Sequence, residues 1–212
     1  MQRFRIAYRR TEPLRYIGNL DMHKVWERYL RRAGIPVAYS QGYHPQPKVQ
    51  QAAPIPLGFL SDHDLVDVWT ESDDFSAGEI NQKLIATPQP GIEIILVSSV
   101  DLNESALPNQ VISAEFRVVP LDPCEISQLE IAISRILAQT SIPREKRGKT
   151  YDLRPLIETL NIVADESLGL TEIHMRLAAR EAATGRPEEV LAELGLDPYA
   201  ARYIRSRLLL AS

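Results

Sequence analysis

The stretch "RFRIAYRRTEPLRYIGNLDMHKVWERYLRRAG", residues 3–34, decides the fold of the first half of the chain. Apolar residues alternate with arginines over residues 3–9, which predicts a half-buried strand. After a connector with a proline and a glycine, apolar residues recur at helical spacing from Leu20 onward. Asn19 is the expected N-cap of this helix and Gly34 its expected end. The stretch therefore predicts a strand followed by an amphipathic helix.

The alternation typical of strands and the spacing typical of helices both recur up to residue 100. Three further strands and one helix are expected, the helix beginning at the N-cap Ser76, and residues 49–58 are expected to be extended, with prolines that suit the edge of a sheet and count as no separate strand of the order. The resulting order, β-α-β-β-α-β, is that of a ferredoxin-like unit. The expected segments are strands at 35–40 ("IPVAYS"), 64–71 and 91–100, an extended segment at 49–58, and a helix at 76–88.

The second half repeats this order. A strand pair joined by a turn at Glu166–Gly169 is expected in its middle, and Pro187 and Gly195 are expected to bound its last helix. The predicted fold class is α+β, as tandem ferredoxin-like units (β-α-β-β-α-β twice) with antiparallel sheets and helices on one face. The predicted domains are 1–100, which holds the basic and aromatic loop, a linker at 101–111, and 112–212. The expected segments are strands at 112–120, 152–165, 169–180 and 203–211, and helices at 122–139 (with Asp122 as cap and Pro123 at its first position) and 186–196.

The charge of the chain is unevenly distributed. The formal net charge is −4, but residues 1–50 carry +7, residues 51–111 carry −9 and residues 112–212 carry −2. An acidic chain argues against a general nucleic-acid coat protein, whereas a local basic face remains compatible with this distribution.

Several classes of protein are excluded or disfavoured by composition. No apolar run reaches the roughly 20 residues of a membrane span, and the N-terminus lacks the apolar core of a secretory signal. Cys124 is the single cysteine, which excludes an internal disulfide and a cysteine metal cluster. The histidines lack ligand spacing, and no P-loop, dinucleotide or nucleophile-elbow motif occurs. We expect a cytoplasmic protein without metal, cofactor or membrane partner, and assign no catalytic residue.

The loop within "AYSQGYHPQPKVQQAAPIPLGF", residues 38–59, concentrates prolines with aromatic and polar side chains. One interpretation is a rigid hairpin tip whose prolines only reduce the entropy of the unfolded chain. The other is a platform that stacks planar groups and holds a phosphate. Both remain open at this point. The candidate ligand-binding residues are Tyr39, Gln41, Tyr43, His44 and Lys48.

Each predicted unit has one cluster of cations near the end of its first helix. The first lies in the last turns of the helix, where a solvated face with favourable dipole placement is the simplest interpretation. The second, "REKRGKTYDLR" at 144–154, surrounds Gly148, where the backbone can approach a ligand closely. Either cluster could be an edge that contacts phosphates, and a solvated turn is the other interpretation of the second cluster. The candidate residues are Arg28, Arg31 and Arg32 in the first cluster, and Arg144, Lys146, Lys149 and Arg154 in the second.

The segment "NLDMHKVWERYLRRAGIPVAYSQGYHPQPKVQQAAPIPLG", residues 19–58, resembles the signature of the bacterial radical-SAM-associated (radical-SAM-linked) protein family, a domain of unknown function. The matching parts are Leu20-Asp21, Arg31 to Gly34, Tyr39 to Lys48 and Pro54 to Gly58. The segments at 146–157 and 196–208 resemble later, weaker motifs of that family. The Ser-His pair usual before Leu-Asp is Gly18-Asn19 here, so no catalytic histidine is expected there.

The resemblance implies a companion to a radical-SAM protein that carries a cobalamin-binding-type domain. The chain has no CxxxCxxC motif and cannot itself hold the iron–sulfur cluster of such an enzyme. We therefore expect a non-catalytic partner or substrate-recognition subunit that binds RNA through a basic and aromatic face. The alternatives are a metal-independent RNA-processing enzyme that uses His44 or Tyr43 with Lys48, and a protein–protein adaptor whose basic face meets an acidic partner.

Overall fold

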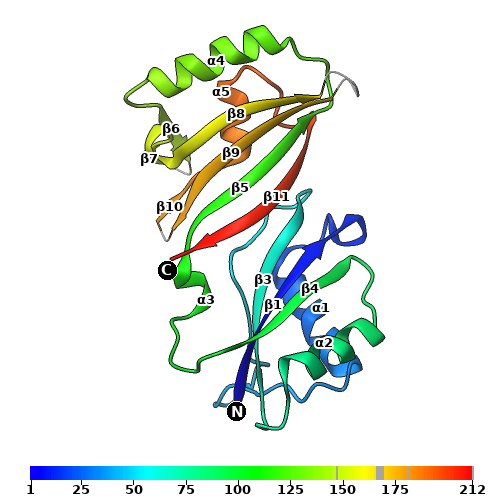
Figure 1. The fold of residues 1–212 in the computed structure, drawn as a ribbon. Coiled ribbons are helices and arrows are strands. Elements are labelled where there is room, and N and C mark those ends of the chain that lie inside the picture. The colour runs from blue at the N-terminus through cyan, green and yellow to red at the C-terminus, as the bar shows by residue number, and fades with distance from the viewer. Residues whose placement is uncertain (147, 166–169, 181, 212) are drawn as a thin grey trace. The chain divides into compact units, whose positions relative to one another are not determined.

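The computed structural model of the chain describes residues 1–212 except 147, 166–169, 181 and 212 (Figure 1). The chain divides into two compact units, residues 1–111 and residues 112–212. Each unit combines helices with antiparallel strands, so the predicted α+β class is confirmed. The predicted turn at Glu166–Gly169 lies outside the described residues. No helix in the described part of the chain is long and apolar enough to cross a membrane.

The first unit is a sheet with two main helices. Strand β1 pairs antiparallel with both β3 and β4, and β2 pairs antiparallel with β3, which gives the strand order β4-β1-β3-β2. The elements are β1 (Gln2–Arg10), α1 (Asn19–Arg32), β2 (Val49–Gln51), β3 (Leu60–Thr70), α2 (Ala77–Ala86), β4 (Ile92–Val100), α3 (Leu107–Gln110) and a 3-10 turn at Glu12–Leu14.

Both helices of the first unit cover the same face of the sheet. Every second residue of β1, at Phe4, Ile6 and Tyr8, is buried in one cluster with the inner faces of α1 and α2. Trp26 of α1 is fully buried there, with its ring 4.8 Å from that of Tyr8 in an edge-on arrangement. Aromatic rings in this geometry add to the stabilisation that burial of apolar surface provides. The alternation read from residues 3–9 thus sets the face on which the core forms.

The predicted ends of the helices in the first unit are correct at Ser76 and Gly34 and wrong at Asn19. The Ser76 hydroxyl accepts a hydrogen bond from the Glu79 amide at 3.2 Å and the Glu79 carboxylate accepts one from the Ser76 amide at 2.8 Å, so the predicted cap is confirmed. Gly34 follows α1 with a φ of +66°, as expected. Asn19, by contrast, is the first helical residue rather than the N-cap, which is Gly18.

The strand predicted at residues 35–40 is wrong. The segment forms only isolated bridges, from Val37 to Thr70 and from Tyr39 to Pro47. The amide of Ala38 donates to Trp69 at 2.7 Å, but the next residues bond to the far side of their own loop instead of continuing along β3. Pro36 and Pro47 have no amide hydrogen to add to a ladder.

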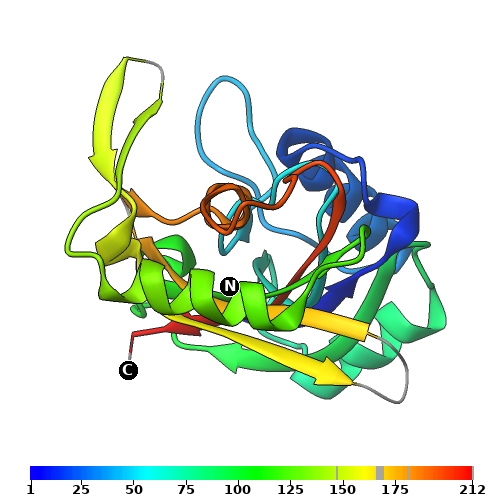
Figure 2. The same ribbon diagram turned by 90° about the horizontal axis from the view of Figure 1, so that it is seen from above.

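The second unit has a sheet of its own and a separate hairpin. Strand β9 pairs antiparallel with β5, β8 and β10, and β11 lies next to β5. The β6–β7 hairpin extends away from α4 in Figure 2. The elements are β5 (Val111–Pro120), α4 (Ile126–Ala138), β6 (Pro143–Lys146), β7 (Lys149–Asp152), a 3-10 turn at Arg154–Leu156, β8 (Ile157–Asp165), β9 (Leu170–Arg180), β10 (Ala183–Thr184), α5 (Pro187–Glu193) and β11 (Ala201–Leu210).

The predicted helix boundaries of the second unit are correct for α5 and wrong for the start of α4. Pro187 begins α5 and Gly195 follows it with a φ of +82°, both as predicted. Helix α4, however, begins at Ile126 after Glu125, not at Pro123 after an Asp122 cap. The amide of Leu121 donates to the Ala200 carbonyl at 2.8 Å and so holds the chain just before this point in a tertiary contact.

Candidate functional site

The loop of residues 38–48 is closed by hydrogen bonds across its base. The Lys48 amide donates to the Ala38 carbonyl at 2.7 Å, and the Ser40 amide donates to the Gln46 carbonyl at 2.8 Å. The Ser40 hydroxyl also accepts from the Gln46 amide at 2.9 Å. Figure 2 shows this loop as the light blue segment that extends away from the strands of its unit. The base is therefore fixed, and a tip of five residues, 41–45, stands on it.

The side chains at the tip are open to solvent. Tyr43 is fully exposed, and its neighbours Gln41 and His44 are exposed as well. Tyr39, at the base, is also exposed, whereas Pro47 opposite it is buried. Gly42 has a φ of +136°, a conformation that L-residues rarely adopt. The tip thus presents a phenol ring and an imidazole beside backbone that only glycine adopts without strain.

A small cavity of about 250 Å³ lies beside the base of the loop. Tyr39 and Pro47 line it from the loop, Glu27 and Arg31 from α1, and Glu71 from the end of β3. The Arg31 guanidinium donates to the Glu27 carboxylate at 2.8 Å. With two carboxylates and one guanidinium, the lining does not favour a phosphate group.

The three predicted arginines of α1 have different surroundings. Arg31 pairs with Glu27, as above, and Arg32 donates to the Pro88 carbonyl and the Gln89 side chain, each at 3.1 Å. Arg28 is exposed. Lys48 is half-buried, with its ammonium nitrogen 3.8 Å from the Met1 sulfur. Arg28 and Lys48 are thus the cations near the loop that donate to no oxygen atom of the residues that the structure describes.

Several arginines of residues 1–50 are held inside the unit by a buried carboxylate or by backbone carbonyls. Arg3 and Arg5 both donate to the buried Asp67 carboxylate, and Arg10 donates to the carbonyls of Leu14 and Ile17. Burial lowers the pKa of Arg5, but the hydrogen bonds and charge of Asp67 and Glu104 outweigh it and leave that pKa raised. The charge of +7 therefore does not amount to a basic surface of that size.

In the second cluster, Arg144 and Arg154 take part in contacts within their own unit. Arg144 forms an ion pair with Glu193 of α5. The Arg154 guanidinium donates to the carbonyl of Leu137, in the last turn of α4, at 3.0 Å and to the Ile157 carbonyl at 3.1 Å. Capping contacts of this kind satisfy the free carbonyls at a helix end. The side chains of Lys146 and Lys149 lie outside the described part of the chain.

Sequence analysis did not identify a ladder of charges on β5, β9 and β11. Glu115 accepts hydrogen bonds from Arg207 and Arg176, each at 2.6 Å, and Glu172 accepts one from Arg117 at 2.9 Å. The alternation of charged with apolar residues in "AEFRV" was the available signal. Within the described ranges, no group of three or more histidine, cysteine or acidic side chains could hold a metal ion.

Comparison with known structures adds little to this geometry. The chain is similar to the crystal structure of an acetolactate synthase small subunit from Thermotoga maritima, with 13% identity, 97% of this chain and 94% of that chain covered, and a TM-score of 0.26. A similarity at this level supports no conclusion about function. No curated protein matches the chain.

A family model does match. It covers residues 3–187, a span that includes the loop, both cation clusters and most of the second unit. Its description is "uncharacterized protein conserved in bacteria". The chain therefore belongs to this bacterial family of uncharacterized proteins, DUF2344.

Proposed function

We propose that this protein is a non-catalytic recognition module that binds single-stranded RNA through the loop of residues 38–48. The single observation that carries the proposal is the fully exposed ring of Tyr43 beside His44, on a tip whose base is closed by hydrogen bonds. Because the backbone at the base of the loop is hydrogen-bonded, stacking of this ring on an unpaired base orders only a short tip, and stacking contributes about 1–3 kcal/mol per base.

The charge near the loop predicts a weak dependence of binding on salt. Arg28 and Lys48 are the cations available to phosphates there, since Arg31 is paired with Glu27 and the Arg32 guanidinium is bonded to Pro88 and Gln89. For single strands the slope of log K against log salt is about −0.7 per phosphate neutralised, so two cations predict about −1.4. If all eight predicted cations acted, Lys48 together with the seven of the two clusters, the slope would be about −5.6.

Fluorescence anisotropy with a labelled, unstructured RNA oligonucleotide tests the proposal. Tyr43→Ala is expected to weaken binding at least about tenfold, whereas Tyr43→Trp retains it because the planar surface remains. Tyr199→Ala is the matched control, because Tyr199 is almost fully exposed but lies in the other unit. No binding at low salt, or an equal loss with Tyr43→Ala and Tyr199→Ala, would exclude the loop as an RNA platform.

The same RNA distinguishes a binder from a processing enzyme. His44→Phe is expected to retain most of the affinity, and the wild-type protein is expected to leave the RNA intact. RNA cleavage that disappears with His44→Phe would favour the alternative in which His44 transfers protons.

A protein–protein adaptor is the second candidate function. The ion pairing of Arg31 and the two carboxylates at the cavity leave surroundings of mixed charge around Tyr39, which suit a protein partner better than a phosphate chain. Tyrosine is also common among the residues that dominate protein interfaces. Loss of a protein partner with Tyr43→Ala, in the absence of RNA binding, would favour this function.

We further propose that the partner is a radical-SAM protein. The support is the resemblance of residues 19–58 to the radical-SAM-linked signature. Affinity purification of the tagged protein from its own host is expected to recover a protein containing iron and acid-labile sulfide, and Tyr43→Ala tests whether the loop contributes. Recovery of no radical-SAM protein under gentle, anaerobic conditions would contradict the association.

We also infer that both units are ferredoxin-like. The strand order β4-β1-β3-β2 of the first unit supports this, as does the order β11-β5-β9-β8 of the second. Strand β1 is antiparallel to both of its neighbours, and β5 is antiparallel to β9. Assignment of cross-strand contacts by NMR would test the pairing of β8 with β9, on which the second assignment depends.

A further inference from the structure

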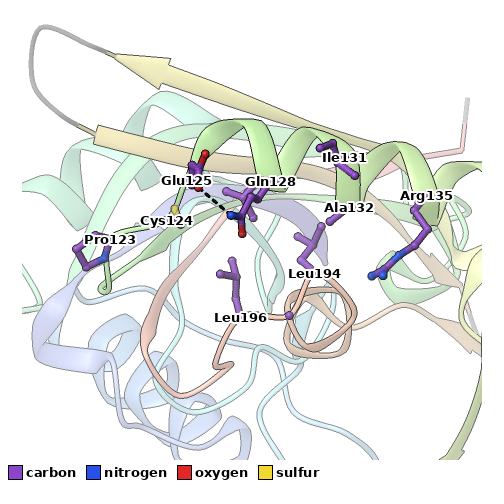
Figure 3. Close-up of a pocket in the computed structure, with 11 residues that line it drawn as sticks. Pro123, Cys124, Glu125, Gln128, Ile131, Ala132, Arg135, Leu194 and Leu196 are labelled. Atoms are coloured by element: carbon purple, nitrogen blue, oxygen red, sulfur yellow. Dashed lines mark hydrogen bonds between the residues drawn. The ribbon is translucent and has the colours of Figure 1, made fainter.

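The second unit contains a groove of about 570 Å³ between α4 and the turn that follows α5 (Figure 3). Its floor is apolar, with Leu129 and Ala132 from α4 and Leu194 and Leu196 from the turn. Figure 3 shows α4 along one side of the groove and the two leucines of the turn across from it. Sequence analysis assigned no function to these residues.

Helix α4 presents two distinct faces. Leu129, Ile133 and Ile136 recur at helical spacing and are buried in the unit. A second stripe along the groove includes Gln128, Ala132 and Arg135. Ile131 lies on the rim of this stripe and is 70% exposed. One exposed isoleucine is ordinary on a protein surface, but here it adjoins an open apolar groove.

Opposite charges lie at the two ends of the groove, at Glu125 and Arg135 (Figure 3). Glu125 accepts hydrogen bonds from the side chains of Ser127 and Gln128, each at 2.8 Å. Arg135 donates to the Glu193 carbonyl at 3.2 Å. All these partners are neutral, and neither charge forms an ion pair with any residue that the structure describes.

The spacing of these groups makes the α4 face complementary to itself. Glu125 and Arg135 are ten residues apart, about 15 Å along the helix, and Ile131 is within one residue of their midpoint. A second α4 placed antiparallel, across a twofold axis near residue 130, brings each Glu125 to the Arg135 of the other copy. It also places Ile131 near the axis, where the small side chain of Ala132 leaves room.

We propose that this face of α4 binds a second copy of the chain as a twofold-symmetric, antiparallel interface. The exposed Ile131 of each copy packs against the groove of the other, and two Glu125–Arg135 ion pairs close the ends. An interface of this kind is isologous, so every contact occurs twice. Because it rests on one helix and one turn, it is small, and we expect a reversible dimer with a Kd of about 10–100 µM.

Sedimentation velocity of the full chain, at concentrations from about 1 to about 300 µM in low salt, tests the interface. Ile131→Asp is expected to weaken dimerisation at least about tenfold, since it places two carboxylates near the axis. Ile85→Asp is the matched control, because Ile85 lies on α2 and is 60% exposed. A monomer at every concentration, or a dimer that Ile131→Asp leaves unchanged, would overturn the proposal.

Charge reversal tests the antiparallel arrangement itself. Glu125→Arg and Arg135→Glu, each alone, replace two attractive contacts by two repulsive ones and are expected to weaken the dimer about tenfold. The double variant restores opposite charges and is expected to recover the wild-type Kd within about threefold. A double variant as weak as the singles would refute the antiparallel pairing. Circular dichroism of each variant confirms that the monomer remains folded.

A cysteine crosslink gives an independent readout. Ile131→Cys in a Cys124→Ser background places one thiol per chain next to the proposed axis, within reach of a disulfide. Under mild oxidation this variant is expected to form covalent dimers several times faster than Ile85→Cys in the same background. Equal crosslinking rates would count against the proposed axis.

Discussion

Replacing Asp67 by asparagine removes the carboxylate that Arg3 and Arg5 share. Asp67 is fully buried in β3, and Arg3 and Arg5 lie on the face of β1 opposite to Phe4 and Ile6. Arg3 donates to Oδ2 of Asp67 through Nε at 2.9 Å and Nη2 at 2.6 Å. Arg5 donates to Oδ1 at 2.9 Å and to Oδ2 at 3.0 Å.

The expected cost follows from this geometry. Asparagine offers one acceptor oxygen and an amide that is itself a donor, so it cannot satisfy both guanidinium groups. Removal of one partner from a buried ion pair leaves an uncompensated charge and costs about 3–5 kcal/mol. The pair between Arg9 and Glu93 is the control, because it also joins β1 to a neighbouring strand but its side chains are 56% and 59% exposed. Glu93→Gln is expected to cost less than about 1 kcal/mol.

Urea unfolding followed by tryptophan fluorescence measures both effects in the first unit. Trp26 and Trp69 are the two tryptophans of the chain, and both lie within residues 1–111. With an m-value of about 1.5 kcal/mol/M, Asp67→Asn is expected to lower the midpoint by about 2–3 M and Glu93→Gln by less than about 0.7 M.

An Asp67→Asn midpoint within about 0.5 M of the wild type, or equal to that of Glu93→Gln, would refute the reasoning. It would mean that the two guanidinium groups find water or other acceptors once the carboxylate is lost, and that burial does not set the cost of this substitution.

Two further predictions concern pH and backbone conformation. The Arg207 guanidinium, together with Arg176, holds the pKa of Glu115 below its usual 4.5, so its stabilising contribution is present above that pH and is lost as the pH falls through the folded-state value. Glu115→Gln is therefore expected to flatten the loss of stability between about pH 5 and pH 3, measured by circular dichroism in urea, and an unchanged pH profile would contradict this. Gly91→Ala is expected to destabilise the first unit by about 2–4 kcal/mol, because the φ of +87° is strained for alanine and its Cβ would lie 2.4 Å from Cγ of Leu14. Gly34→Ala, with a φ of +66° and no atom closer than 3.9 Å, carries the backbone strain alone and is expected to cost about half as much in the same fluorescence assay.

The sequence by itself predicted the features that depend on neighbours a few residues away. The alternation in residues 3–9 placed β1 and its buried face, and Ser76 marked the start of α2. Pro187 marked the start of α5 in the same way. These features can be predicted because a helix cap or a pleated strand depends on side chains only two to four positions apart in the sequence.

The errors occurred where distant backbone decided the local conformation. Residues 35–40 have the composition of a strand, but after Ala38 their hydrogen bonds go to the other side of the loop. Helix α4 begins later than its apparent cap, just after the amide of Leu121 bonds to Ala200, 79 positions along the chain. Neither partner can be recognised from the segment itself.

The same division applies to the candidate site. The prolines of the loop predicted a rigid hairpin tip, because each proline fixes its own φ wherever it occurs. Which cations remain available to a ligand was decided only by the tertiary structure. Arg5 meets Asp67 at a separation of 62 residues and Arg144 meets Glu193 at 49. Charges interact through space, so the folded chain, and not the order of its residues, determines which of them are already neutralised.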